Sequence, residues 1–419
     1  MQAPKQGACP LRAHRWCLLL TPQPLRSPAL GWVIVILVAL AAAIGQAFGR
    51  FSYGILLPAV RDDLQVSNTI AGLIGATNVS AYLIGTLCVS WATSHFRLIT
   101  VFRIGLLLAA LGLGLASLST GATTLSLALL ITGLGGACLW IPAPAIAAAA
   151  LSERFRSLAV GLMGSGIGLG IVFVSILSGQ LRATVGDEAW SDIYGIQFML
   201  ALLLLILIFC LVRHHQAEPS GGAGLGGFGA LRRMPGWRPL LLAYAAFGFM
   251  YLLVLGFLTS RLEDDSQWLT VDAATAFTLT GIAMIFGGPI FATVAQRIGV
   301  RFTLCMAFGL WPLLVTAVLS GSPQWVFPAC LGLGLLFSAL PTLITLYVVN
   351  NTNTTDYGPS FSAATLVFGL AQTLSPATGG LIADATGSFW VVFLLAAGLG
   401  FIGLLAAWRL PHTQTTEPS

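Results

Sequence analysis

Charged residues are scarce in this sequence, and only one of them lies deep inside a long apolar stretch. Of the 419 residues, 8% are charged and 57% are hydrophobic, and the mean hydropathy is +0.91. These values lie outside the range of soluble globular domains, so the chain is predicted to be a membrane protein. The net charge of +5 is distributed too unevenly to indicate nucleic-acid binding, and no nucleic-acid partner is expected.

The apolar stretches also lack the residue types that most membrane chemistry needs. No Asp or Glu falls in their interior, since Asp192 lies only at an edge, and the five histidines fall in loops or tails. The seven cysteines have neither metal-ligand spacing nor a disulfide pattern and are predicted to be free thiols. An enzyme would need a nucleophile with a base, or metal ligands, at membrane depth. We therefore predict neither enzymatic activity nor a cofactor.

Twelve apolar stretches are each long enough to cross a bilayer as a helix, which takes about 20 residues. They lie near residues 31–58, 69–91, 99–119, 123–149, 158–181, 192–212, 238–260, 273–295, 301–320, 325–349, 361–383 and 388–408. The predicted fold class is an all-α membrane protein with 12 transmembrane helices.

An internal repeat divides these helices into two bundles of six. Ala47-Phe48-Gly49 recurs as Ala246-Phe247-Gly248, and a segment rich in glycine and arginine separates the sixth and seventh stretches. The predicted organisation is a cytoplasmic tail at 1–30, a bundle at 31–212, a flexible cytoplasmic linker at 213–236, a second bundle at 237–410 and a cytoplasmic tail at 411–419.

The basic residues lie mostly on one side of the predicted membrane. Apart from Arg50, only Arg61, Arg182 and Arg261 among the 19 Lys and Arg fall on the other side. The positive-inside rule therefore places both termini in the cytoplasm. We expect the chain to act as a monomer in the lipid bilayer of a bacterial inner membrane. Acidic clusters fall on the side opposite the termini, at residues 62–63, 187–188 and 263–265.

Arg50 is the charged residue inside the first stretch. A guanidinium deep in a bilayer costs about 2.5–3.5 kcal/mol on insertion scales, so it is expected to face a cavity or a partner. At α-helical spacing Gln46 and Tyr53 share its face. The repeat places Phe249 at the matching position of the second half. Since a scaffold role would tend to occur in both halves, this difference favours a substrate contact for Arg50.

Twelve helices in two repeated halves resemble the major facilitator superfamily over residues 31–410. Within it, the run Gly-Arg-Phe-Ser-Tyr followed by Leu-Leu-Pro, at residues 49–58, is similar to the YbfB/YjiJ-type bacterial permeases. It is also similar to the monocarboxylate and oxalate/formate carriers, which place basic residues along their path. The resemblance implies a transporter that works by alternating access.

A cytoplasmic motif of the superfamily, Gly-x-x-x-Asp-Arg-x-Gly-Arg-Arg, is partly matched at residues 292–301. Arg297, Gly299 and Arg301 fit it, which implies a gating role, whereas Gln296 replaces the aspartate and puts the charge relay of that motif in doubt. The superfamily's fourth-helix arginine, often linked to proton coupling, is replaced by Leu129. The sequence therefore leaves open whether a proton is transported together with the solute.

By the same resemblance, helices 1, 4, 7 and 10 line a central cavity with helices 2, 5, 8 and 11 beside them. Polar and aromatic residues of these helices are the predicted substrate-binding residues: Arg50, Gln46, Tyr53, Asn78, Tyr82, Trp140, Tyr251, Thr345 and Gln372. For each polar residue the alternative role is an interhelical hydrogen bond, and for Trp140 and Tyr251 it is packing against lipid or core.

A fixed guanidinium favours a carboxylate, which it holds with two parallel hydrogen bonds. The predicted function is therefore secondary active transport of a small organic solute, specifically an organic anion such as a carboxylate, with Arg50 as its anchor. The alternative is an efflux pump for neutral or amphipathic compounds. Exchange, uniport and proton symport remain open, and so does a purely structural role of Arg50 at a gate.

Overall fold

The computed structural model describes residues 28–212 and 227–411, and nearly all of them are helical. In this part of the chain, 12 helical spans are long and apolar enough to cross a membrane. The predicted number of spans and the all-α membrane fold are therefore confirmed. The tails at 1–27 and 412–419 and residues 213–226 of the predicted linker lie outside the described residues.

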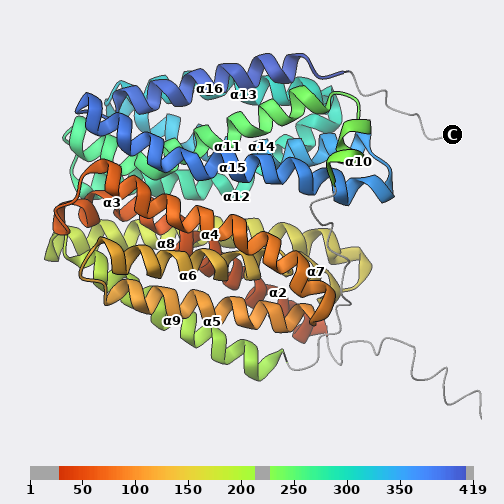
Figure 1. Cartoon of the computed structure of the whole chain (residues 1–419), viewed down its shortest axis with the longest axis horizontal. Helices are drawn as coiled ribbons and strands as arrows, with labels where there is room; N and C mark the ends of the chain where they lie inside the picture. Colours follow the sequence, from red (N-terminus) through yellow and green to blue (C-terminus); the bar gives the residue numbers. More distant parts are fainter. Residues whose placement is uncertain (1–27, 213–226, 412–419) are drawn as a thin grey trace, which may run out of the picture.

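Six spans form each half, and the halves lie one above the other in Figure 1. The helices of the first half are α2 (Pro28–Ala42), η1 (Ala43–Phe51) and α3 (Ser52–Asp63), which together make the first span, then α4 (Asn68–His95), α5 (Leu98–Ser117), α6 (Ala122–Trp140), α7 (Ala143–Ala150), η2 (Glu153–Phe155), α8 (Arg156–Val185) and α9 (Ala189–Leu211). Those of the second half are α10 (Phe228–Arg233), α11 (Trp237–Ser260), η4 (Arg261–Asp265), α12 (Thr270–Ile298), α13 (Val300–Leu319), α14 (Pro323–Asn351), α15 (Thr354–Thr386) and α16 (Trp390–Trp408).

The first span is not a continuous α-helix. Its middle part, η1, is a π-helix, in which backbone hydrogen bonds reach five residues back; at its end the Ser52 N–H bonds to the Ala47 carbonyl. Such wide turns are rare and are often found at functional sites. The wider turn shifts the side-chain register, so the structure departs from the α-helical stripe expected for Gln46, Arg50 and Tyr53.

Three helix pairs join the two halves: α3 with α11, α4 with α15, and α8 with α12. Glycines bring the halves close together, because a Cβ on Gly54 would lie 2.4 Å from the Leu255 carbonyl oxygen, and one on Gly72 would lie 2.3 Å from that of Pro376. We call the end of the bundle at which α3 finishes the α3 end; it lies opposite the end at which α2 begins (Figure 1). The halves therefore meet closely between Arg50 and the α3 end.

The second part of the predicted linker is folded. Helix α10 packs against α15, and its Leu231 is buried together with Met234 just after the helix. Arg233 forms an ion pair with Asp356 at 2.7 Å. The structure thus differs from the expectation of a flexible linker over residues 227–236, because the apolar side chains of this segment find a surface of the second half to cover.

Candidate functional site

Arg50 reaches from η1 across to the second half. Its Nη2 donates one hydrogen bond to the Tyr251 hydroxyl, at 2.6 Å, and another to Gln372 Oε1. The Tyr251 hydroxyl in turn donates to Gln372 Oε1 at 2.8 Å. These three residues, from η1, α11 and α15, were all predicted as site residues, and the structure brings them into one hydrogen-bonded cluster. We call it the Arg50 cluster.

Aromatic rings surround the guanidinium of Arg50. Its Cζ lies 5.0 Å from the ring centre of Tyr82, 5.7 Å from that of Phe51 and 6.0 Å from that of Tyr251. Contacts of this kind stabilise a cation by about 0.5–2 kcal/mol each, which offsets part of the cost of removing the charge from water. Within the described residues no Asp or Glu pairs with Arg50, so its positive charge is left without a counter-ion.

Two buried donors have no hydrogen-bond partner by geometry in the part of the chain that the structure describes: Arg50 Nε and Gln46 Nε2. Gln46 is only 5% exposed, and its side chain lies near the Tyr82 hydroxyl. A buried donor left unsatisfied costs about 1–3 kcal/mol. An acceptor supplied by a ligand would remove this cost, so the cluster has the chemistry of an anion-binding site.

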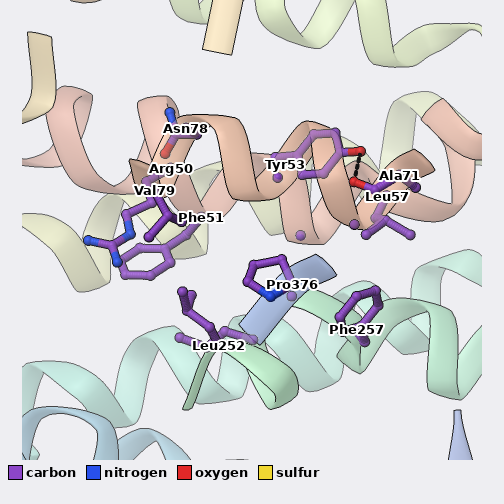
Figure 2. Close-up of a pocket in the computed structure, with 15 residues that line it drawn as sticks. Arg50, Phe51, Tyr53, Leu57, Ala71, Asn78, Val79, Leu252, Phe257 and Pro376 are labelled. Atoms are coloured by element: carbon purple, nitrogen blue, oxygen red, sulfur yellow. Dashed lines mark hydrogen bonds between the residues drawn. The ribbon is translucent and has the colours of Figure 1, made fainter. Parts of the chain in front are cut away.

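A cavity of about 30 Å³ begins at Arg50 and follows α3 and α11, where residues of both halves line it (Figure 2). Its walls are mostly small or apolar residues, among them Gly75, Val79 and Pro376, with Arg50 at one end. A volume of this size holds about one water molecule. The site is therefore closed to an organic solute on the side of the α3 end.

Tyr53 lines the same cavity but points away from Arg50 (Figure 2). Its hydroxyl donates to the Ala71 carbonyl at 2.7 Å, which ties α3 to α4. The π-helical register accounts for this placement, because it turns Tyr53 off the face that carries Arg50.

Asn78 lines the cavity, and its Nδ2 holds η1 in place while its Oδ1 has no hydrogen-bond partner among the described residues. Its Nδ2 lies within hydrogen-bonding distance of three buried acceptors: the Gly49 carbonyl at 2.7 Å, the Leu129 carbonyl at 2.8 Å and Thr132 Oγ1 at 2.9 Å. Gly49 directly precedes Arg50 in η1. The Asn78 amide therefore fixes the backbone from which the Arg50 side chain extends.

Among the described residues, no hydrogen bond or ring contact links Trp140 or Thr345 to the Arg50 cluster. Trp140 is partly buried at the end of α6, and Thr345 Oγ1 donates to the Pro341 carbonyl of its own helix at 2.8 Å. Neither residue lines the cavity beside Arg50.

The predicted gating residues lie at the end of the bundle opposite the α3 end. Gly299 has a φ of +87° and forms the turn between α12 and α13, a conformation that glycine adopts without strain. Arg301 donates to the Trp408 carbonyl at 2.5 Å, and Arg297 is exposed at the end of α12. In the described residues the Arg301 contact stays within the second half.

Sequence reasoning missed the charged pairs that join the halves at the α3 end. Arg61 pairs there with Asp264, and Arg182 pairs with Glu263 at 2.8 Å. The sequence feature that could have indicated these pairs is an acidic cluster that falls, together with isolated arginines, on the side that otherwise lacks basic residues.

The chain matches the profile of the family described as "Uncharacterised MFS-type transporter YbfB" over residues 40–408. It is 22% identical over 402 residues to the cis,cis-muconate transport protein of Acinetobacter baylyi, covering 91% of this chain and 95% of that protein. It is 25% identical over 409 residues to monocarboxylate transporter 6 of Homo sapiens, covering 90% and 79%. A shorter match, 26% over 176 residues, links it to the multidrug efflux pump SdrM of Staphylococcus aureus, covering 42% and 38%.

Among solved structures, a D-xylose–proton symporter has the same fold. It superposes with a TM-score of 0.73 at 14% sequence identity, and the superposition covers 91% of this chain and 98% of that one. At this identity the likeness concerns the fold alone.

Proposed function

This chain belongs to the YbfB-type family of the major facilitator superfamily, and we propose that the solute it transports is a small organic anion with a carboxylate group. Its family and its relatives are transporters, so the protein is a membrane transporter of small solutes and not an enzyme. The carboxylate is the part of this statement that we add.

The observation that carries the proposal is the uncompensated charge of Arg50 between the two halves. A guanidinium that lacks a counter-ion and has a buried, unsatisfied Nε matches the two oxygens of a carboxylate. Two relatives that align over most of this chain are named for carboxylate solutes, muconate and monocarboxylates, which supports the same class.

The conformation fits one step of alternating access. The halves are in close contact between Arg50 and the α3 end, where the cavity holds about one water molecule. In the orientation predicted from the basic residues, the α3 end faces away from the cytoplasm. The solute would then reach Arg50 from the cytoplasmic side in this state and leave past the α3 end once the halves separate there.

Ligand-dependent thermal stabilisation tests the proposal, because a ligand that binds the folded state raises its apparent stability. The purified protein would be melted with cis,cis-muconate, lactate or glucuronate, and with the uncharged dimethyl ester of muconate and glucose. We expect a carboxylate to raise the melting temperature of the wild type and not that of Arg50→Gln. Arg103→Gln is the matched control, because Arg103 bonds to the Val212 carbonyl, outside the Arg50 cluster. Equal shifts in Arg50→Gln and wild type would contradict the proposal.

Efflux of neutral or amphipathic compounds is the second candidate. It is favoured by the shorter match to a multidrug efflux pump and by an aromatic stack beside the site. In that stack the ring centres of Tyr244 and Phe368 lie 4.6 Å apart, and those of Phe247 and Tyr251 lie 5.1 Å apart. Stabilisation by uncharged compounds alone, unaffected by Arg50→Gln, would favour this candidate.

A further inference from the structure

We propose that Gln372 and Tyr251 take the place of the substrate carboxylate in the empty carrier, so that the protein exchanges one anion for another faster than it reorients empty. This inference rests on the carboxylate function proposed above and adds the mode of transport. It assigns Gln372 a role in coupling the substrate to the movement of the two halves.

The number and positions of the N–H groups of Arg50 limit how a carboxylate can bind to it. A guanidinium has five N–H groups, and a carboxylate binds it in parallel either through Nη1 and Nη2 or through Nε and Nη2. Both arrangements need Nη2. In the structure Nη2 donates to both Tyr251 and Gln372. A carboxylate held by two bonds therefore has to displace at least one of them.

A carboxylate on the Nε side of the guanidinium would satisfy a donor of Arg50 that is buried without a partner in the described part of the chain. Nε is buried and has no partner in the described residues, so the Nε–Nη2 pair offers one unsatisfied N–H beside one that Gln372 or Tyr251 occupies. A carboxylate bound there satisfies Nε and releases a residue of the second half. The ligand thus gains a hydrogen bond that the empty protein cannot make.

The second half stays satisfied after this exchange of partners. The Tyr251 hydroxyl donates to Gln372 Oε1 at 2.8 Å, a bond in which Arg50 takes no part. Both side chains are buried, at 6% and 1% exposure, so a loss of all partners would be costly for them. Substrate binding therefore weakens the link between the halves at Arg50, and the residue that is released keeps a hydrogen-bond partner within the second half.

The Arg50 cluster lies next to the surface on which the halves close. Pro376, one helical turn beyond Gln372 on α15, has its carbonyl oxygen 2.3 Å from where a Cβ on Gly72 would be. Separation of the halves at this point also separates Arg50 from Gln372 and Tyr251. The empty carrier then loses both charge-assisted hydrogen bonds without replacement, whereas in the loaded carrier the carboxylate has already replaced at least one of them.

We therefore expect empty reorientation to be slower than loaded reorientation by on the order of 10-fold, the size of effect that one charge-assisted hydrogen bond has. The test uses the full-length protein in liposomes loaded with labelled cis,cis-muconate. Release would be timed into buffer alone and into buffer that contains unlabelled cis,cis-muconate. For the wild type, external muconate should speed release about 10-fold. A ratio near one would overturn the proposal.

Two substitutions of Gln372 should change the rate of release into buffer alone in opposite directions. Gln372→Leu removes the acceptor, so release into buffer alone should rise and the ratio should fall toward one. Gln372→Glu offers Arg50 a stronger acceptor, so release into buffer alone should fall below the wild-type rate. Thr373→Val is the matched control, because the Thr373 hydroxyl bonds to the Gly369 carbonyl of its own helix. An unchanged ratio in Gln372→Leu would overturn the proposal.

Hydrogen exchange of the empty protein gives a readout that needs no substrate. Amides of residues 52–63 and 255–265, which meet at the α3 end, should exchange faster in Gln372→Leu and slower in Gln372→Glu than in the wild type. If carboxylates move but neither the release ratio nor this exchange responds to Gln372, the exchange mode is wrong and the proposed function stands. If no carboxylate is bound or moved by any variant, the proposed function and the exchange mode fall together.

Discussion

Arg61 on α3 and Asp264 in η4 form a two-point ion pair that joins the two halves at the α3 end. Arg61 Nη2 donates to Asp264 Oδ1 at 3.0 Å, and Nη1 donates to the other carboxylate oxygen. Asp384 of the second half adds to this closure by accepting from the Asn68 backbone N–H at 2.9 Å, at the start of α4. Charged contacts and glycine contacts therefore close the same end of the bundle.

Asp264→Asn should loosen this end with little loss of overall stability. The pair is partly exposed, at 15% for Arg61 and 27% for Asp264, so its net contribution is about 1 kcal/mol or less. We expect faster hydrogen exchange in residues 52–63 and a small drop in melting temperature. Asp62→Asn is the control, because Asp62 pairs with the same arginine but lies in the same half. If both variants exchange alike, the pair does not hold the halves together.

Gly72→Ala should hinder closure at the α3 end. The added Cβ would lie 2.3 Å from the Pro376 carbonyl oxygen, so α4 and α15 have to move apart. Overpacking of this kind costs about 1–3 kcal/mol, which here falls on the closed state. Melting and hydrogen exchange would measure it, with Gly398→Ala as the control, since a Cβ at Gly398 meets nothing within 4 Å. If the amides of Gly72→Ala exchange hydrogen as slowly as those of the wild type, the α3 end is not closed as described.

Asn78→Ala should lower both stability and ligand binding, although Asn78 does not contact Arg50. The substitution removes the hydrogen bonds of the Asn78 amide to the Gly49 and Leu129 carbonyls, at about 1 kcal/mol for each bond, and leaves Thr132 Oγ1 within hydrogen-bonding distance of both carbonyls. Release of Gly49 should also let η1 relax and displace Arg50, so carboxylates should stabilise the variant less. Thr77→Val is the control, because its hydroxyl bonds to its own helix at 3.0 Å. If carboxylates raise the melting temperature of Asn78→Ala as much as that of the wild type, η1 positions Arg50 without the hydrogen bonds of Asn78.

Arg50→Lys should keep the charge at the site and lose most of the affinity. An ammonium is a point charge that cannot hold both oxygens of a carboxylate in parallel. We expect the dissociation constant for a carboxylate to rise about 10-fold, which is roughly 1.4 kcal/mol. Titration by thermal shift would measure it beside Arg50→Gln. Equal affinities of Arg50→Lys and wild type would mean that charge alone binds the anion.

Several features of the fold followed from local patterns of the sequence. The number of spans could be predicted because each crossing needs its own run of about 20 apolar residues. The boundaries shifted where helices continue past the predicted ends; the first span, predicted to end at Pro58, runs to Asp63. Proline is tolerated inside such helices because neighbouring groups satisfy the freed backbone. Family membership likewise follows from the sequence, which matches the YbfB-type profile over residues 40–408.

The sequence by itself also determined that Arg50 is exceptional, because the cost of a charge in a bilayer is a property of one residue and its immediate neighbours. Which residues join it was decided by the tertiary structure. Tyr251 and Gln372 lie 201 and 322 residues away in the chain and meet Arg50 only because α11 and α15 pack against the first half. The π-helical turn that directs Tyr53 elsewhere depends equally on its neighbours: Asn78 and Thr132, from two other helices, hold the Gly49 carbonyl. Periodicity along one helix carries no information about such contacts between helices, and they are what distinguish a binding residue from a structural one.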